Sequence, residues 1–499
     1  LKDPLTGPRW NGWGVDTANS RFQPSSSAQL SVNDVPKLAL KWAFGFPGAR
    51  SAYAQPTVAG GRVFVGSDNA FVYSLDAETG CVYWSYHAEA AVRAAISIGA
   101  ATGSGRYIAY FGDLKANVYA VDADSGALVW KKKADEHPVA RVTGAPILEG
   151  GRVYVPVASI EEATGPNPKY ECCTFRGSVV AYDAITGNEI WKGYTIPEKA
   201  KPIKKNASGT QLWGPAGAAV WSAPTIDLAR GVLYVGTGNT YSAPAADTSD
   251  AIVAFDLKSG IQKWSKQLTP KDVFIVNCGP NAQTRENCPD DMGPDFDIGN
   301  SPILQKLADG RSVIVVAQKS GVVWALDPDH EGAVLWQHRI GKGSALGGME
   351  WGSAADGQAG YFPVSDGLMG PVAAGGLFAL KLSTGEEIWQ THPPARDCPA
   401  ASPRCVQAQS AAISVIPGVV FSGTTSGVMR AYSTTDGRIL WEYDTVHEYT
   451  TVNGVPGKGG SINGPGPTIV GGKLFMNSGY VVLGGALPGN VLLAFGVEQ

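Results

Sequence analysis

The chain has 499 residues, with 40 Lys and Arg against 44 Asp and Glu and a formal net charge of −4. Its charge is sparse and evenly mixed, with no basic run, so nucleic acid is excluded as an expected partner. No run of roughly 18 apolar residues occurs, so we expect no membrane-spanning helix. The 63 glycines and 33 prolines are typical of many short strands joined by turns.

A short phrase recurs along the chain and organises it. Its clearest copy, Ala181 to Trp191, reads Ala-x-Asp-x-x-Thr-Gly-x-x-x-Trp. The Asp side chain can bond its own backbone and Gly accepts positive φ, so the middle of the phrase predicts a turn. Apolar runs on both sides make the unit a hairpin. Weaker copies end at Trp84, Trp130, Trp264, Trp336, Trp389 and Trp441, and a fragment of the phrase ends at Trp42.

The spacing of these tryptophans indicates the fold class. Self-similarity at roughly 40–50 residues, lengthened where loops are inserted, is typical of four-stranded propeller blades. One such sheet cannot bury both faces alone, whereas radial stacking buries them and leaves few edges. We therefore predict an all-β fold, an eight-bladed β-propeller of four-stranded antiparallel blades. Unrelated strands that share a turn are the alternative, which eight copies with Trp at one offset disfavour.

The two ends of the chain predict how the ring closes. The last blade supplies three strands, ending near residues 490–495, and the N-terminal strand around Trp42 supplies the fourth. This pairing leaves no free edge. Residues 1–36 would then form an arm over a neighbouring blade, and residues 37–499 a single propeller domain. Long insertions, where function usually resides, are expected at 156–176, 193–220, 239–250, 268–296, 390–408 and 443–463.

The seven cysteines predict the compartment. Cys278 and Cys288 bracket one short polar loop, and Cys398 and Cys405 bracket another, so each pair is expected to form a disulfide. That pattern favours an oxidising compartment, the periplasm or the cell exterior, over a reduced cytosolic protein. No signal peptide is visible, as in a mature product. Cys81 is left without a partner.

The order of strands within a blade selects the face where chemistry would lie. Counting strands A to D from the axis outward, the residues just before strand A and just after strand B meet at one mouth of the central channel. Polar and aromatic side chains occupy these slots, which predicts a buried site of mixed charge. Before strand A stand Tyr53, Arg93, Thr143, Trp221, Asp297, Glu350 and Trp351, and after strand B stand Glu171, Asn239 and Lys319.

These residues resemble those of the eight-bladed quinoprotein alcohol dehydrogenases, which use pyrroloquinoline quinone (PQQ) and a calcium ion. The most specific match is Trp221 followed 18 residues later by Asn239 in Gly-Thr-Gly-Asn. Phe296-Asp297 stands where the family has Trp-Asp, and Lys319 where it has Lys or Arg. The likeness covers essentially the whole chain. The runs around Cys172 and Trp351 are most similar to the branch that acts on polyvinyl alcohol.

The resemblance implies a role for each of these residues. Glu171, Asn239 and Asp297 would supply oxygen ligands to Ca²⁺, a hard cation. Asp297 would also act as the catalytic base, and Lys319 would stabilise charge on the reduced cofactor. Trp221 would stack on the ring system. The remaining cofactor contacts are assigned to Arg93, Thr143, Glu350, Trp351, Cys172 and Cys173.

Several of these positions also have plainer interpretations. Asp297 could be a turn residue, as Asp291 and Asp295 could, and Asn239 could merely suit its turn. Lys319 could be a solvated lysine and Trp221 one more core tryptophan. Two positions have named competitors: Glu161 or Glu162 for Glu171, and Arg106 for Arg93.

Two departures from the family pattern bear on the cofactors. The adjacent Cys172 and Cys173 stand one blade later than the family's vicinal disulfide, so their pairing and role stay open. Lanthanide-using relatives carry a second Asp two residues after the catalytic one, and Gly299 occupies that position here, which favours calcium.

We therefore expect a PQQ- and Ca²⁺-dependent dehydrogenase that oxidises alcohol groups, particularly secondary hydroxyls of polyvinyl alcohol, and passes electrons to a soluble cytochrome c. A dehydrogenase for small primary alcohols and a non-catalytic propeller scaffold are the alternatives.

Overall fold

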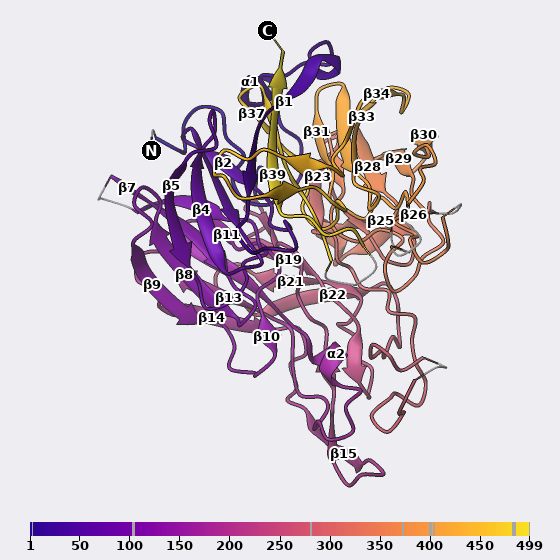
Figure 1. Cartoon of the computed structure of the whole chain (residues 1–499). Coiled ribbons are helices and arrows are strands. Elements are labelled where there is room, and N and C mark those ends of the chain that lie inside the picture. The colour runs from indigo at the N-terminus through magenta and orange to yellow at the C-terminus, as the bar shows by residue number, and fades with distance from the viewer. Residues whose placement is uncertain are drawn as a thin grey trace.

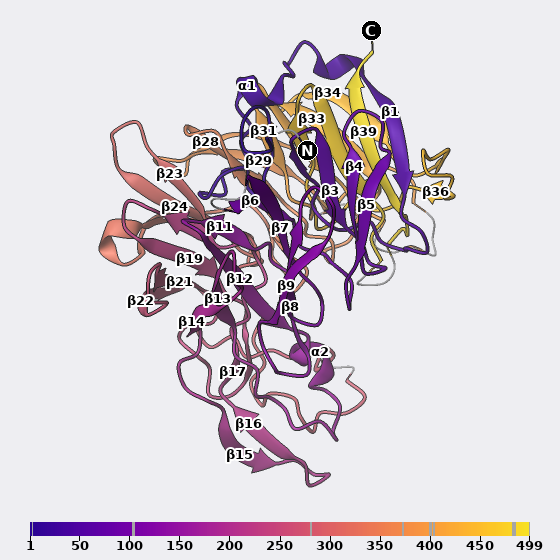
Figure 2. The same ribbon diagram turned by 90° about the vertical axis from the view of Figure 1, so that its left-hand side faces the viewer.

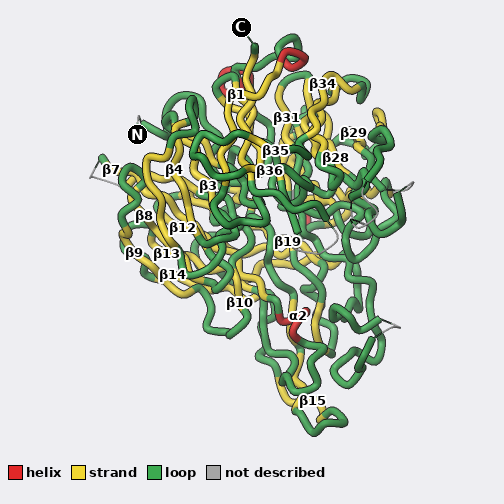
Figure 3. The backbone as a smooth tube through the Cα atoms, in the orientation of Figure 1, coloured by secondary structure: helices red, strands yellow, loops and turns green. Residues whose placement is uncertain are grey.

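The computed structural model describes residues 1, 3–101, 105–279, 282–371, 374–398, 402, 405–481 and 486–498. Almost all of its regular structure is β (Figure 3). The exceptions are short: α1 (Ser25–Ala28), α2 (Glu161–Thr164) and the 3₁₀ turns Val35–Lys37 and Pro328–His330. None of the described helices is long and apolar enough to cross a membrane.

Within the described residues, eight antiparallel sheets surround a central axis, as predicted (Figures 1 and 2). The first four blades are built, from the axis outward, of β2 (Thr57–Ala59), β3 (Arg62–Gly66), β4 (Phe71–Asp76) and β5 (Val82–His87); β6 (Ser97–Ala101), β7 (Arg106–Gly112), β8 (Asn117–Asp122) and β9 (Leu128–Lys133); β11 (Ile147–Glu149), β12 (Arg152–Ser159), β13 (Ser178–Asp183) and β14 (Glu189–Tyr194); and β18 (Thr225–Asp227), β19 (Val232–Gly236), β21 (Ala251–Asp256) and β22 (Gln262–Gln267).

The second four blades follow the same order. They are built of β23 (Ile303–Lys306), β24 (Ser312–Ala317), β25 (Val322–Asp327) and β26 (Ala333–Arg339); β27 (Ala354–Ala355), β28 (Ala359–Pro363), β29 (Leu377–Lys381) and β30 (Glu387–Thr391); β31 (Ser414–Ile416), β32 (Val419–Gly423), β33 (Val428–Ser433) and β34 (Ile439–Asp444); and β37 (Thr468–Val470), β38 (Lys473–Ser478), β39 (Val491–Val497) and β1 (Leu38–Gly45). Strand β1 pairs antiparallel with β39, so the ring closes as the chain ends predicted (Figure 1).

The recurring tryptophan joins each blade to the next. The indole of Trp84 in the first blade donates to Ala123 O in the second at 3.1 Å, and Trp441 of the seventh donates to Leu38 O in the eighth at 3.2 Å. The backbone of the turn glycine packs closely against the indole ring of the neighbouring blade. A Cβ on Gly187, where φ is +67°, would come within 2.7 Å of Trp130. The phrase is therefore an inter-blade contact as well as a turn.

Insertions of the third and fourth blades form a projection on one mouth of the channel, below the blades in Figures 1 and 2. It contains α2 and the hairpin of β15 (Lys201–Lys205) and β16 (Gln211–Gly214). Smaller pairs are β17 (Ala216–Gly217) with β20 (Thr240–Ser242), β35 (Glu448–Tyr449) with β36 (Gly457–Lys458), and β10 (Ala140–Arg141) with β12. We call this mouth of the channel the site mouth.

The N-terminal arm does not lie over one blade, as we expected, but runs around the axis. The innermost strands expose unpaired backbone groups toward the channel, and such groups need partners when buried. The arm supplies them in seven of the eight blades. Its partners are Val58, Ile98, Ile226, Leu304, Ala355, Val415 and Ile469. Each lies farther along its strand than the residues at the site mouth, so the arm occupies the opposite mouth, which we call the arm mouth.

The predicted disulfides Cys278–Cys288 and Cys398–Cys405 are confirmed, and Cys172 and Cys173 are also bonded to each other. Cys81 is unpaired and exposed. Disulfides at these positions agree with an oxidising compartment.

Candidate active site

A cavity of about 260 Å³ opens at the site mouth, where the strand order predicted it. Eight of the predicted site residues line it, brought together from positions over 250 residues apart. They are Arg93, Thr143, Trp221, Asn239, Asp297, Lys319, Glu350 and Trp351. Among the other lining residues are six polar side chains that the sequence did not single out as primary candidates: Arg141, Ser159, Glu162, Tyr241, Asp295 and Tyr480.

Asp297 and Lys319 form the centre of the cavity's polar half. Lys319 Nζ lies 2.9 Å from Asp297 Oδ2 and 3.2 Å from Asp295 Oδ1, and all three side chains are buried. The backbone N–H of Asn239 donates to Asp297 Oδ1 at 2.7 Å. The Asp297 carboxylate thus accepts a charge-assisted hydrogen bond from an ammonium group and a second hydrogen bond from a backbone N–H. Burial alone would lower the pKa of Lys319, but Asp295 and Asp297 raise it well above its usual value.

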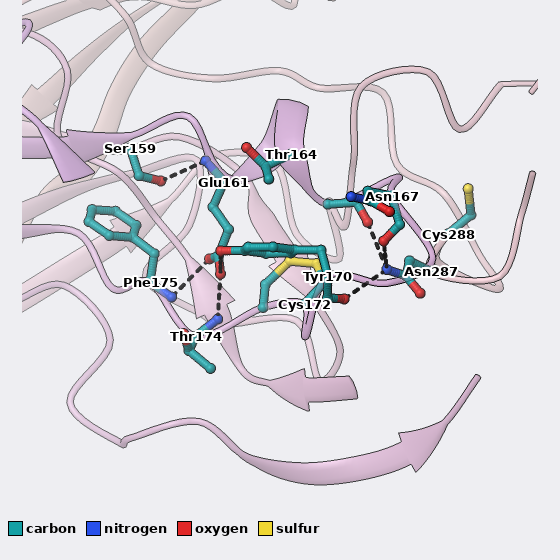
Figure 4. The surroundings of a disulfide bond; sticks show 12 residues. Ser159, Glu161, Thr164, Asn167, Tyr170, Cys172, Thr174, Phe175, Asn287 and Cys288 are labelled. Atoms are coloured by element: carbon teal, nitrogen blue, oxygen red, sulfur yellow. Dashed lines mark hydrogen bonds between the residues drawn. A yellow bond between two sulfur atoms is a disulfide. The ribbon is translucent and has the colours of Figure 1, made fainter. Parts of the chain in front are cut away.

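The three acidic candidates of the third-blade insertion occupy different environments. Glu161 is buried and accepts hydrogen bonds from Tyr170 and from the backbone of Thr174 and Phe175, so its role is structural (Figure 4). Glu171 is exposed outside the cavity and accepts from the indole of Trp213 at 3.3 Å. Glu162, on α2, lines the cavity.

The structure therefore does not bring Glu171 together with Asn239 and Asp297. The physical reason is the length of strand B in this blade. We placed the start of the insertion at residue 156, but β12 continues to Ser159. The residues immediately after the strand are consequently those of α2, and Glu162, named as a competitor, takes the slot that we assigned to Glu171.

Glu162 faces an excess of negative charge. Burial raises its pKa to about 8, and the carboxylate of Asp297 contributes in the same direction. Burial also raises the pKa of Asp250 and Asp295 well above the usual range, and each is opposed by Lys319. Lys319 is a single positive charge among these carboxylates. An added cation would offset the repulsion.

The oxygen atoms of the cavity suit a hard cation. The described residues hold no group of three or more His, Cys, Asp or Glu arranged as a metal site. A mixed set is present, however, in Glu162, Asp297 and the amide of Asn239. Both N–H groups of that amide are donated at 2.9 Å, to Thr240 O and Phe274 O. The amide is thereby fixed, and its oxygen is left as the group available to a cation.

The opposite half of the cavity is aromatic and cationic. Arg93 lies over the ring of Trp351 at 4.0 Å and donates to the hydroxyl of Tyr480 at 2.9 Å. Trp221 meets Trp351 edge to face, with ring centroids 5.0 Å apart. Arg141 adds a second guanidinium whose Nε is buried without a partner. Burial, and then Arg93, lower the pKa of Arg141. This half therefore suits a flat, anionic ligand.

Three assignments are clarified by position. Arg106 pairs with Asp122 at 3.0 Å on the outer part of the second blade, whereas Arg93 lines the cavity. Thr143 lines the cavity and donates to Trp221 O at 3.5 Å. The Cys172–Cys173 pair lies in a buried core cluster outside the cavity lining (Figure 4).

Simple signals mark the residues that we missed. Arg141 stands two positions before Thr143, and Tyr241 two positions after Asn239, so both belong to slots already identified. Ser159 ends β12. Tyr480 follows β38 and reaches the cavity at ring closure. Widening each named slot by two residues would have included Arg141, Tyr241 and Asp295, but not Ser159, Glu162 or Tyr480.

The propeller and its axial cavity, acidic on one side and cationic and aromatic on the other, define a class of ligand-binding propeller. A family profile described as glucose/ethanol/alcohol dehydrogenase, beta-propeller domain, matches residues 10–281. A second, described as outer membrane protein assembly factor BamB, matches residues 175–458.

Individual proteins are similar over nearly the whole chain. A polyvinylalcohol dehydrogenase of Pseudomonas sp. is 43% identical over 99% of this chain and 78% of that protein. A second, from Sphingopyxis sp. strain 113P3, is 42% identical over 98% and 76%. The solved structure of quinohemoprotein alcohol dehydrogenase ADHIIG from Pseudomonas putida HK5 aligns with a TM-score of 0.75 at 19% identity, covering 98% of this chain and 80% of that one. The chain belongs to the family of PQQ-dependent quinoprotein alcohol dehydrogenases.

Proposed function

We propose that this protein is a PQQ- and Ca²⁺-dependent dehydrogenase that oxidises secondary hydroxyl groups of polyvinyl alcohol or a similar extended alcohol. The observation that carries the proposal is the full-length likeness to two polyvinylalcohol dehydrogenases, combined with a cavity that holds an acid–base pair, oxygen ligands and a cationic aromatic wall.

The two halves of the cavity suit the two cofactors. Glu162, Asn239 and Asp297 would hold the calcium ion, with Glu162 in place of Glu171. Arg93, Arg141 and Thr143 would bind the carboxylates of PQQ, and Trp221 would offer its flat face, with Trp351 and Glu350 beside it. When bound, PQQ supplies the two-electron acceptor and Ca²⁺ the Lewis acid that polarises it.

The residues of the chain handle the proton and the geometry. Asp297 accepts the hydroxyl proton of the alcohol while the hydrogen on the carbinol carbon leaves as hydride, so the product is a ketone. The ammonium of Lys319 donates to the Asp297 carboxylate at 2.9 Å and holds it in position. Electrons would then pass to a soluble cytochrome c. The disulfides favour the periplasm or cell exterior as the place of action.

Two alternatives define the test. A preference for small primary alcohols would keep the same chemistry, and a non-catalytic scaffold has support from the match to an assembly-factor profile. We would add PQQ and Ca²⁺ to the cofactor-free protein and measure dye reduction with 2-propanol, 2-hexanol, 2,4-pentanediol, ethanol and polyvinyl alcohol. We expect a quinone absorption band and higher kcat/KM for the secondary and polymeric alcohols. The absence of both the band and dye reduction would favour the scaffold.

A further inference from the structure

The arm brings one tryptophan to the underside of the cavity. Trp13 packs against three small residues, Ala95, Ala145 and Ala223, each of which stands two residues before an inner strand. These come from the second, third and fourth blades, and in the described part of the chain the third blade is the one whose inner strand forms no hydrogen bond with the arm. Trp13 therefore occupies the gap in an otherwise continuous ring of backbone contacts at the arm mouth.

Three spaces follow one another along the axis at this point. The cavity at the site mouth shares Arg93, Thr143, Trp221 and Trp351 with a small chamber of about 20 Å³ beneath it. The chamber in turn shares Trp13 with a groove of about 300 Å³ at the arm mouth. Among the described arm residues, Trp13 alone lines both the chamber and the groove.

The chamber is small, and its lining includes polar atoms that a water molecule can bond. Trp13 Nε1 and Ser222 Oγ, both from its lining, are buried without hydrogen-bond partners. A space of about 20 Å³ exceeds the roughly 10–15 Å³ that one water molecule needs. One trapped water could therefore satisfy these atoms, whereas a continuous column of water requires an open groove.

Trp13 is held firmly in this place. The guanidinium of Arg21 lies 4.7 Å from its ring centroid and donates to Trp13 O at 2.6 Å. Arg21 is itself fixed to the seventh blade through Ile413 O, at 2.5 Å, and Ser414 Oγ, at 3.0 Å. The indole is thus anchored to the propeller independently of its contacts with the chamber.

We infer that Trp13 is a positioning residue for the cofactor: it closes the channel behind Trp221, Trp351, Arg93 and Thr143 and keeps water from the underside of the PQQ site. This inference rests on the proposed function. Without the indole, the chamber and the groove would merge, and solvent would reach four residues assigned to cofactor binding. Ion pairs between arginine and a carboxylate weaken when water enters, and the Trp221 face would lose support from below.

Trp10 provides a matched control in the same arm. It is fully buried, and the guanidinium carbon of Arg21 lies 5.4 Å from its ring centroid. Like Trp13, it has an indole N–H without a hydrogen-bond partner. It packs in the core of the last two blades, however, and does not line the chamber. Replacing either tryptophan removes a large side chain, but only Trp13 lines both the chamber and the groove.

The experiment compares Trp13→Ala, Trp13→Phe and Trp10→Ala as cofactor-free proteins with Ca²⁺ present. The dissociation constant and dissociation rate of PQQ are measured by fluorescence titration and by displacement, together with the melting temperature of each protein. We expect Trp13→Ala to bind PQQ at least about tenfold more weakly, the smaller end of the loss that removal of an outer supporting group causes. Trp13→Phe should restore most of the affinity, and Trp10→Ala should bind as the wild type does despite a lower melting temperature.

The outcomes separate this inference from the proposed function. Binding of PQQ by Trp13→Ala as tightly as by the wild type, or equal weakening in Trp10→Ala, would overturn the role of Trp13 while leaving the dehydrogenase assignment in place. Failure of the wild type to bind PQQ would overturn both. If Trp13→Ala does not fold, Trp13→Leu takes its place, with weaker PQQ binding than in Trp13→Phe expected and equal binding contradicting the inference.

Discussion

The two mouths of the channel are built from the same repeat but have opposite properties. At the site mouth, long insertions and strand ends gather Glu162, Asp295, Asp297 and Lys319 in one cavity. At the arm mouth, residues of a single segment pair with the inner strands and close the channel with buried side chains such as Trp10 and Arg21. One end of the ring therefore carries the candidate active site, and the other end mainly stabilises the fold. Changes at the first should alter binding and turnover, and changes at the second, apart from those at Trp13, should alter stability.

The largest effect is expected at Asp297. Asp297→Asn removes the proton acceptor but keeps the size of the side chain, so kcat should fall by about 10²–10⁴-fold. The melting temperature should change little, and Asp309→Asn, which alters an exposed carboxylate of the same blade, should leave kcat unchanged. Full dye-linked activity in Asp297→Asn would remove this residue from the mechanism.

The strongest effect at the arm mouth is expected for Arg21→Met. The change leaves Ile413 O and Trp13 O without their donor in a buried place, so the free energy of unfolding should fall by about 2–4 kcal/mol. Denaturant unfolding would measure this, with the exposed Arg438→Met as control. A loss no greater than in the control would mean that these hydrogen bonds of the arm contribute little to the stability of the propeller.

Glu162 and Glu171 lie in the same insertion but are expected to differ in their effect on calcium binding. Glu162→Gln should weaken Ca²⁺ binding by about 10–100-fold, whereas Glu171→Gln should bind Ca²⁺ as the wild type does, because Glu171 lies outside the cavity. Calorimetric titration of both cofactor-free variants with Ca²⁺ would measure the two affinities. The reverse result would return the ligand role to Glu171.

The smallest effect concerns pH. The pKa of Glu162, about 8 in the cation-free protein, lies above its usual value, so below that pH a bound cation must displace a proton. Ca²⁺ affinity should therefore rise by at most about tenfold per pH unit up to about pH 8 and then level off. The same shift makes the cation-free fold less stable as pH rises through that range, because the folded state binds this proton more tightly than the unfolded chain does. Titrations from pH 6 to 9 would check the slope, which Glu162→Gln should flatten.

The sequence by itself determined the blades, because turn chemistry, strand alternation and the docking tryptophan are local and repeat at each unit. It also determined which slots face the axis, and Asn239, Asp297, Lys319 and Trp221 were found there. Features that depend on the length of a strand or on contacts between distant segments became visible only in the tertiary structure. The four extra residues of β12 placed Glu162 rather than Glu171 at the cavity. Residues 10–28 run around the axis because they form hydrogen bonds with the otherwise unpaired inner edges of seven strands. Neither fact is local, because each depends on where several distant segments meet.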